Sequence, residues 1–302
     1  MLKTQFLEKE FENPIVLASG ILGLTACCMK NAVANGCAGV TTKSISLEER
    51  SGHPNPTIMG SDHYFINAVG LSNPGVKNVI KEIEKFKQIC TAPIICSIFA
   101  GTPDEFALIT EKICKSPIDF LEINISCPNV SKEFGKPFAY SIEAVKSITK
   151  KVKEKSKVPL LVKVSPNAWN IAEIAKTAEE NGADAIVAVN TISGMAIDVQ
   201  SRRPLLYNKQ GGVSGPALFP IALKCVYDIY KKVKIPIIGT GGITTGKDAM
   251  AMIMAGATLL GIGSAVYFRG EKAFAQIIDE MKKIMEEEGI ASLDDIRGCA
   301  HD

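Results

Sequence analysis

Short apolar runs alternate with longer amphipathic segments along most of the chain. A short apolar run indicates a buried strand, whereas apolar residues spaced three or four apart indicate a helix packed on one face. The pattern predicts strands at residues 15–18, 39–43, 94–97, 120–124, 160–164, 185–190, 236–240 and 258–262. It predicts helices at residues 76–90, 104–114, 142–155, 171–181 and 220–233. Glu82 with Lys85 and Glu111 with Lys115 have the spacing of ion pairs on solvated helix faces.

The order of these elements predicts the fold class. Eight strands with intervening helices fit a closed parallel (β/α)8 barrel, the TIM barrel. An open doubly wound sheet is the alternative, but it would carry a glycine-rich turn after its first strand, whereas here glycine turns follow the seventh and eighth. We expect residues 1–302 to form one barrel domain, with the residues before Asn13 forming a hairpin across the bottom.

Three connections are longer than the others, and each follows the carboxyl end of a predicted strand. They are the polar or irregular insertions at residues 44–75, 125–140 and 191–216. The carboxyl ends of barrel strands form the mouth, where barrel enzymes carry their catalytic residues. We therefore expect these insertions to surround the active site.

Composition and charge exclude several other classes of protein. The net charge of +2 predicts no nucleic-acid partner. Nine cysteines without a CxxC or metal-like spacing indicate a reducing, cytoplasmic setting and no metal site. The first residues lack the apolar core of a signal peptide. Residues 249–268 carry no charge, but glycines at 256, 261 and 263 favour a helix end, a short strand and a loop over a membrane span.

Two glycine-rich motifs follow the last two predicted strands. Residues 238–243 read IGTGGI, and residues 261–264 read GIGS. The loops after strands 7 and 8 are the usual phosphate site of such barrels, because small residues let backbone N–H groups approach an anion. Tight turns that need glycine for positive φ are the alternative explanation of either motif alone. Their occurrence on consecutive strands favours phosphate binding.

Two lysines lie at the ends of predicted strands. Lys43 ends the second strand, and Lys163 lies in the fifth at a position that alternation would turn toward the barrel interior. A lysine is rarely buried without a partner, and a fixed ammonium would stabilise the negative charge of a reduced flavin. A solvated, inert lysine at the barrel rim is the alternative.

Cys127 is the candidate catalytic base. It follows the fourth strand in the segment LEINISCPNV, among polar residues and at the start of a long insertion. A lone cysteine is more often a small buried apolar residue, and we expect this of four others: Cys90, Cys96, Cys114 and Cys225. A histidine base, His53 or His63, is the alternative, since both lie in an insertion that could reach the mouth; His301 lies in the C-terminal tail.

Asparagines gather around the same mouth. Asn67, Asn124, Asn129 and Asn190 could together read a flat ligand with amide edges, because each supplies both donors and an acceptor. Thr191 adds a hydroxyl. Turn formation or helix capping is the alternative role of each amide taken singly.

These motifs together resemble the dihydroorotate dehydrogenase family. The matching segments, in chain order between residues 13 and 268, are the KS pair at residues 43–44, NAVGLSNPG, NISCPN, VNTISGM, GGVSGP, GTGG and GIGS. The resemblance implies that FMN oxidises dihydroorotate to orotate in pyrimidine biosynthesis. It implies that Cys127 takes the proton from C5 while hydride leaves C6 for flavin N5.

The resemblance also implies the roles of individual residues. The substrate would be held by Lys43, Asn67, Ala68, Val69, Gly70, Leu71, Asn124, Asn129, Asn190 and Thr191. FMN would be held by Ser19, Lys43, Ser44, Asn124, Lys163, Val189, Gly215, Gly241, Gly242, Gly263 and Ser264. One position departs from the family pattern: Ser97 stands where NAD-linked relatives usually have an asparagine.

Within the family, the cysteine base and the run NTISGMAID followed by RRPLLYNKQGGVSGPALFPIALK are most similar to the NAD-linked form. That similarity implies a homodimer core within a heterotetramer. Its partner would be an electron-transfer subunit that carries FAD and a 2Fe–2S cluster. A fumarate-reducing homodimer, a dihydropyrimidine-reducing relative and a non-catalytic phosphate-binding barrel remain the alternatives.

Overall fold

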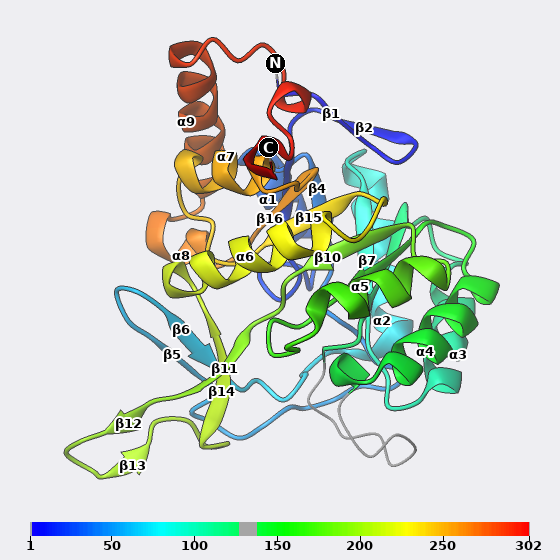
Figure 1. Cartoon of the computed structure of the whole chain (residues 1–302). Coiled ribbons are helices and arrows are strands. Elements are labelled where there is room, and N and C mark those ends of the chain that lie inside the picture. Colours follow the sequence, from blue (N-terminus) through cyan, green and yellow to red (C-terminus); the bar gives the residue numbers. More distant parts are fainter. Residues whose placement is uncertain (1, 127–137, 302) are drawn as a thin grey trace.

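Eight parallel strands close into a barrel in this computed structural model, which describes residues 2–126 and 138–301. Around the barrel they follow the order β3 (Ile15–Leu17), β4 (Gly39–Thr41), β7 (Ile94–Ile98), β8 (Phe120–Asn124), β9 (Leu160–Lys163), β10 (Ala185–Ala188), β15 (Ile237–Thr240) and β16 (Leu259–Ile262). Each predicted strand is present, and its ends differ by at most two residues from those expected. The (β/α)8 fold class is confirmed, and Figure 1 shows the helices around the strands.

Helices fill the connections between barrel strands. The longer ones are α1 (Ala26–Ala34), α2 (Gly75–Ile89), α3 (Pro103–Ile113), α4 (Ile142–Lys155), α5 (Ile171–Glu180), α6 (Phe219–Tyr230), α7 (Gly246–Met254), α8 (Ala265–Arg269) and α9 (Ala273–Glu287). Single 3-10 turns are η1 (Phe138–Tyr140), η2 (Pro216–Leu218), η3 (Leu293–Asp295) and η4 (Cys299–His301). Hydroxyl side chains cap several N-termini, as Thr102, Ser141 and Thr245 do for α3, α4 and α7.

One of the two predicted ion pairs on helix faces is present. Lys85 Nζ lies 2.7 Å from Glu82 Oε1 within α2. The other prediction was wrong about the partner: Glu111 on α3 pairs with Lys155 of α4 at 2.5 Å rather than with Lys115. The two helices pack side by side, so a neighbouring helix supplies the nearer ammonium.

Side chains alternate between the inside of the barrel and the helical layer. In β9, Leu161 and Lys163 face the interior, whereas Leu160 and Val162 pack in the larger apolar core between strands and helices. The interior-facing position expected for Lys163 is therefore observed. Glu122 in β8 also faces the interior and is 2% exposed.

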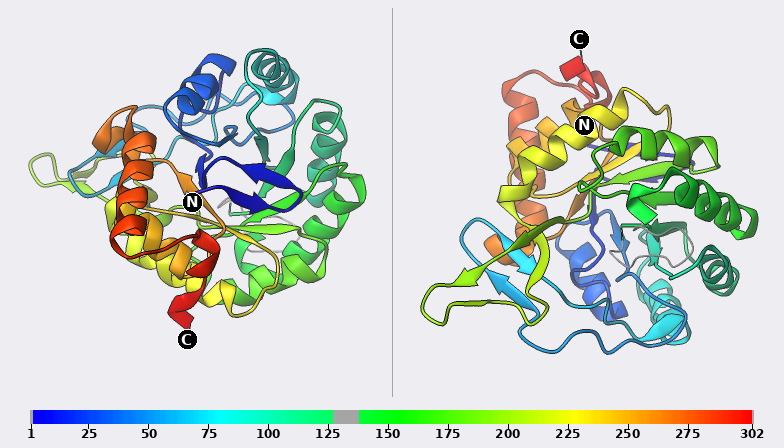
Figure 2. Two further views of the ribbon diagram at one scale, coloured as in Figure 1. Left: turned by 90° about the horizontal axis from the view of Figure 1, so that it is seen from above. Right: turned by 60° about the horizontal axis from the view of Figure 1, so that its bottom comes forward.

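The N-terminal hairpin covers the bottom of the barrel, as predicted. It consists of β1 (Thr4–Phe6) and β2 (Lys9–Phe11), and Figure 2 shows it lying across the barrel. Its Phe6 and Phe11 rings lie 5.6 and 6.2 Å from the Phe120 ring. Together with interior aliphatic side chains these rings fill that end of the barrel.

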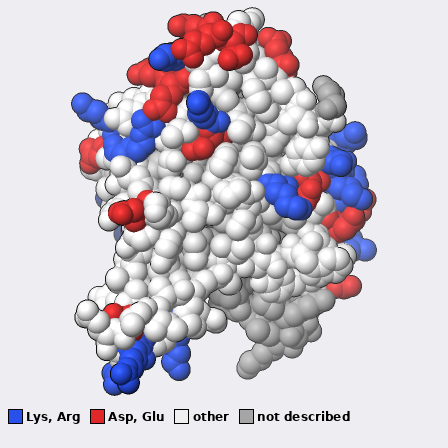
Figure 3. Space-filling model, turned by 60° about the vertical axis from the view of Figure 1, so that its left-hand side comes forward, with Lys and Arg blue, Asp and Glu red and all other residues white. Residues whose placement is uncertain are grey.

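Two of the three insertions carry more regular structure than expected. Strands β5 (Ile58–Gly60), β6 (Phe65–Asn67), β11 (Ile192–Met195) and β14 (Gln210–Ser214) form one antiparallel sheet in the order β11-β14-β6-β5. Beyond it, β12 (Ile197–Asp198) pairs with β13 (Arg203–Pro204). This lobe projects from the barrel mouth, with basic side chains at its tip (Figure 3). Most of the remaining insertion, at residues 125–140, lies outside the described residues.

Residues 249–268 do not form one apolar helix. Helix α7 ends at Met254, strand β16 follows at Leu259–Ile262, and α8 begins at Ala265. This agrees with the helix, strand and loop predicted from the glycines. Across the described ranges, no helix is long and apolar enough to cross a membrane.

Candidate functional site

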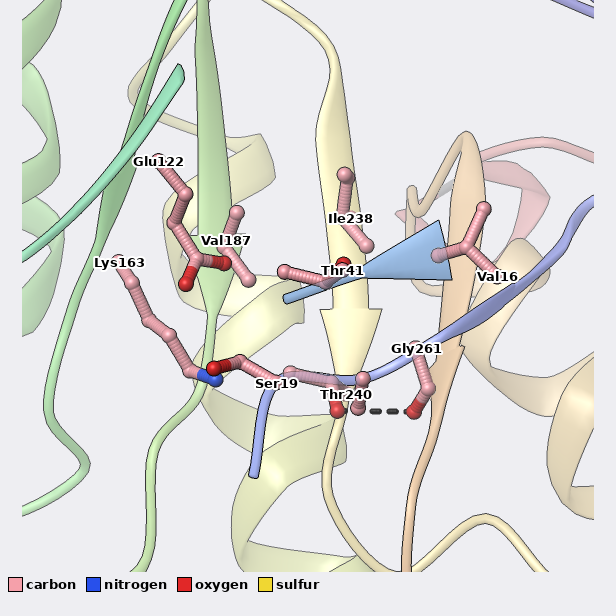
Figure 4. A pocket seen from close by; sticks show the side chains of 10 residues that line it. Val16, Ser19, Thr41, Glu122, Lys163, Val187, Ile238, Thr240 and Gly261 are labelled. Carbon is pink, nitrogen blue, oxygen red and sulfur yellow. Dashed lines mark hydrogen bonds between the residues drawn. The ribbon is translucent and has the colours of Figure 1, made fainter. Parts of the chain in front are cut away.

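A pocket opens inside the barrel near the carboxyl ends of the strands (Figure 4). Its polar lining comes from Ser19, Thr41, Glu122, Lys163 and Thr240, and its apolar lining comes from interior aliphatic side chains and Gly261. In Figure 4 the Glu122 and Lys163 side chains both point into the pocket. A pocket that joins apolar walls to a few fixed polar groups is typical of a cofactor or substrate site.

Two lysine side chains near this pocket, Lys43 and Lys163, are close enough for their charges to repel one another. Lys163 is 6% exposed, and neither its ammonium nor that of Lys43 makes an ion pair or hydrogen bond with another described residue. Burial, together with repulsion from Lys163, lowers the pKa of the Lys43 ammonium below its ordinary value. Two cations without a partner among the described residues form an electropositive site suited to an anionic ligand.

A chain of side-chain hydrogen bonds crosses the pocket wall from one strand end to the next. Ser97 Oγ donates to Glu122 Oε1 at 2.6 Å and lies 2.8 Å from Ser44 Oγ. Ser44 Oγ accepts from Asn124 Nδ2 at 3.3 Å and lies 3.3 Å from Ser19 Oγ. The chain therefore joins three predicted ligand-binding residues to a carboxylate that the sequence analysis did not select.

A second group of contacts places Asn124 beside Asn190. Asn190 Nδ2 donates to Asn124 Oδ1 at 3.3 Å and to Ser126 Oγ at 2.5 Å, while Thr191 N donates to Asn190 Oδ1 at 2.8 Å. Ser126 also donates its N–H to Asn124 Oδ1 at 3.2 Å. Two of the predicted amides thus converge at the mouth, next to the residue that precedes Cys127 in the sequence.

The glycine loops form the opposite side of the mouth. Gly242 has φ +74°, and a Cβ there would lie 2.6 Å from both Gly215 O and Phe219 N, so glycine is required where the loops approach. Within the described part of the chain, the N–H groups of Gly242, Gly263 and Ser264 donate no hydrogen bond. Free backbone N–H groups in neighbouring loops can bind a phosphate.

Val189 is placed beside the same loops. It is 3% exposed, and its N–H donates to Thr240 O at 2.8 Å, at the end of β15. This contact holds the end of β10 against the strand that leads into the first glycine motif. Its position is compatible with the cofactor contact implied by the resemblance.

The insertion lobe brings Asn67 and the following loop to the mouth. Asn67 lies in β6, and its Nδ2 donates to Gly212 O of β14 at 3.2 Å. A Cβ at Gly212 would lie 2.1 Å from Thr191 Oγ1, so Thr191 packs directly against this sheet. Residues 67–71 therefore lie on the lobe that also contacts a barrel-end threonine.

The structure does not describe two of the predicted site residues. Cys127 and Asn129 lie outside the described residues. The histidine alternatives gain no support: His53 is exposed, with Nδ1 3.1 Å from Ala68 O, and His63 is exposed. His301, in the C-terminal tail, stacks on Tyr227 with ring centroids 3.8 Å apart.

The other cysteines are placed largely as expected of apolar residues. Burial raises the pKa of the Cys96 thiol to about 12 and that of the Cys225 thiol to about 11, so both are held as thiols near neutral pH. Cys90 and Cys114 are half-buried and pack against the core. None of these four lines the pocket described above.

Sequence comparisons agree with this geometry. A dihydroorotate dehydrogenase family model matches residues 1–285. The chain is 42% identical over 300 residues to a Pyrococcus abyssi protein named dihydroorotate dehydrogenase B (NAD(+)), catalytic subunit, covering 99% of each chain. Proteins of the same name from Methanocaldococcus jannaschii (42% identity; 100% of this chain and 99% of the relative) and Thermococcus kodakarensis (43% identity; 96% and 95%) are similar along nearly their whole lengths. The chain therefore belongs to the dihydroorotate dehydrogenase family of oxidoreductases.

Proposed function

We propose that this chain is an FMN-dependent catalytic subunit that oxidises dihydroorotate to orotate in pyrimidine biosynthesis. The observation that carries the proposal is the convergence of Lys43, Lys163, Asn124 and Asn190 at one barrel mouth. Ammonium groups without a partner among the described residues suit an anionic flavin and a carboxylate substrate, and the amides suit the N–H and C=O edges of a pyrimidine ring.

The residues fit FMN. The free N–H groups of Gly242, Gly263 and Ser264 would hold its phosphate, with Gly215 and Gly241 shaping the loops. Lys163, Lys43, Ser19, Ser44, Asn124 and Val189 would contact the rest of the cofactor. When bound, FMN would supply the oxidant that takes up hydride from C6 of dihydroorotate at its N5 atom.

The substrate site would lie between the lobe and the barrel. Asn67, the following Ala68–Leu71 loop, Asn124, Asn190 and Thr191 would hold the ring, with Asn129 from the neighbouring insertion. Because Asn190 Oδ1 accepts from Thr191 N, its Nδ2 group is directed toward Asn124 and Ser126. This arrangement would fix the orientation of the amides before the ligand binds.

Cys127 would remove the proton from C5 of the substrate. A free thiol has a pKa of about 8.5, and nearby positive charge favours its thiolate form. Lys43 would supply part of that charge. Cys127 directly follows Ser126 in the sequence, and the Ser126 hydroxyl donates to Asn124 Oδ1.

The names of the relatives support a proposal for the electron acceptor. Their printed name includes NAD(+) and designates a catalytic subunit. We infer that this chain forms a homodimer core within a cytoplasmic heterotetramer and passes electrons to NAD through a partner carrying FAD and a 2Fe–2S cluster. The projecting lobe exposes Met195, Ile197, Val199 and Tyr207, which supports a protein-binding role for that surface.

Purification and substrate choice test the proposal. We expect the full chain to retain FMN and to oxidise dihydroorotate but not dihydrouracil, because the latter lacks the carboxylate that the lysines would bind. Preference for dihydrouracil would support a dihydropyrimidine-reducing enzyme, and absence of flavin after mild purification would support a non-catalytic barrel.

Co-purification tests the partner. An iron–sulfur flavoprotein that accompanies the chain from its native source should confer NAD reduction. If the chain alone reduces fumarate with dihydroorotate, the assignment of the acceptor fails while the chemistry at the mouth stands.

A further inference from the structure

Glu122 is a buried carboxylate to which the proposed reaction gives no role. It is 2% exposed and lies in β8, two residues before Asn124. Its neighbour in the hydrogen-bond chain, Ser97, is fully buried at 0% exposure. Burying a charge is costly unless it is hydrogen-bonded, so a carboxylate retained here invites a functional explanation.

The hydrogen-bond chain has a defined direction because each serine hydroxyl carries one proton. Ser97 donates its proton to Glu122, so it can only accept from Ser44. Ser44 then donates its proton to Ser97 and presents only lone pairs to the pocket. One of those lone pairs accepts from Asn124 Nδ2.

The direction of the chain determines what the mouth residues offer a ligand. With its NH2 group turned to Ser44, Asn124 turns its carbonyl oxygen to the Ser126 N–H and to Asn190 Nδ2. Ser44 has no proton left to give, and its two lone pairs face Asn124 Nδ2 and Ser19 Oγ, so Ser19 donates to Ser44. The Ser97 hydroxyl donates to Glu122 and accepts from Ser44. The Ser97 backbone N–H donates to Thr42 Oγ1 at 3.0 Å.

We propose that Glu122 is a positioning residue that acts through Ser97 to fix Ser44 as an acceptor and to set the Asn124 amide for cofactor binding. This inference rests on the proposed function, because it takes Ser44 and Asn124 as contacts of FMN. Glu122 itself faces the pocket beside Lys163 (Figure 4). Its effect on Ser44 is transmitted through one hydroxyl group, that of Ser97, so mutations of Glu122 and Ser97 can test it.

A double-mutant cycle tests the proposal. Full-length wild type, Glu122→Gln, Ser97→Ala and the double variant would be purified with FMN, and the dissociation constant would be measured from the fluorescence of FMN released on dilution. The glutamine side chain introduced by Glu122→Gln can present either an oxygen or an amide N–H to Ser97, so the obligate direction is lost. We expect each single variant to weaken FMN binding about tenfold. We expect the double variant to show about the same tenfold loss, because both changes break one chain.

The control variant is Ser97→Thr, which keeps the hydroxyl and should bind FMN nearly as wild type does. A loss of about a hundredfold in the double variant would mean independent effects and would overturn the proposal. Wild-type affinity in either single variant would also overturn it. A merely structural role would lower the free energy of unfolding in urea and leave the FMN dissociation constant of the folded protein unchanged.

The two proposals fail in different ways. A wild-type chain that binds no FMN contradicts the proposed function and this inference with it. A wild-type chain that binds FMN, with single variants that bind it equally well, contradicts the role of Glu122 alone.

Discussion

The two ends of the barrel are built in opposite ways. At the N-terminal end the rings of Phe6, Phe11 and Phe120 fill the space between the strands. The Asp119 carboxylate there is bound by Lys87 at 2.6 Å and by Lys9 at 2.7 Å. Apolar groups are packed and charges are paired, so this end contributes chiefly to stability.

At the mouth, the described residues leave buried and half-buried polar groups without such compensation. Lys43 and Lys163 have no ion-pair partner within the described chain, and three loop N–H groups donate no hydrogen bond. Unpaired groups of this kind lower stability unless a ligand completes them. The N-terminal end of the barrel therefore stabilises the fold, whereas the mouth is arranged to bind ligands. Mutations should therefore separate stability from function by the end they touch.

The largest effect is expected for Cys127→Ala at the mouth. Loss of a general base should lower the rate of dihydroorotate oxidation by about 10^3- to 10^4-fold while FMN stays bound. The measurement is steady-state turnover of yellow, FMN-loaded protein. Cys127→Ser should retain a trace of activity that rises with pH, because a hydroxyl loses its proton less readily than a thiol. Turnover like that of wild type in the alanine variant would refute the assignment of the base.

Phe11→Ala should destabilise the N-terminal end of the barrel. The side chain is 1% exposed and contacts two other rings, so its removal should cost about 3–5 kcal/mol of unfolding free energy in urea. FMN affinity and substrate KM of the folded protein should stay unchanged. A large loss of FMN affinity at unchanged stability would contradict the division between the two ends.

Lys163→Met should act on the ligand rather than on the fold. It removes a charge that has no partner in the described parts of the chain but keeps an unbranched side chain, so FMN affinity should fall roughly tenfold to a hundredfold. Lys87→Met is the matched control at the bottom, where the ammonium is paired with Asp119. The control should lower stability and leave FMN binding intact. Unchanged flavin affinity and unchanged flavin reduction in Lys163→Met would count against its role.

The smallest effect is expected for Asp119→Asn. Burial alone would raise the pKa of Asp119, but hydrogen bonds from Lys87, Lys9 and the Ile94 N–H hold it below its ordinary value. A lowered folded-state pKa contributes stability above the unfolded pKa of about 4, and this contribution is lost as pH falls through the folded value. The variant should lose about 1 kcal/mol at neutral pH and show a flatter decline in acid. Urea unfolding at several pH values measures both, and an unchanged acid limb would contradict the pairing.

Much of the barrel could be predicted from the sequence because its strands are short apolar runs between amphipathic helices. The insertion sheet could not, because Asn67 pairs with Gly212 across a long sequence separation and neither strand shows apolar alternation. Glu111 shows the same limit on helix faces, since its partner Lys155 comes from a neighbouring helix.

The candidate site was predictable where residue type and strand position coincided. Lys163 and Asn124 end barrel strands and Asn190 lies two residues beyond β10, so all three lie at the mouth. Glu122 was missed although a signal existed: a charge within the apolar run FLEIN is rare unless it is buried with a partner. The partner, Ser97, comes from the neighbouring strand β7, and the pairing register of β7 with β8 sets it beside Glu122.

Anaerobic mixing of the purified chain with dihydroorotate tests the central claim most directly. Oxidation of the substrate by bound FMN should bleach the visible flavin absorption and release one orotate per flavin, without any partner protein. Flavin that keeps its full visible absorption in excess dihydroorotate would contradict the account.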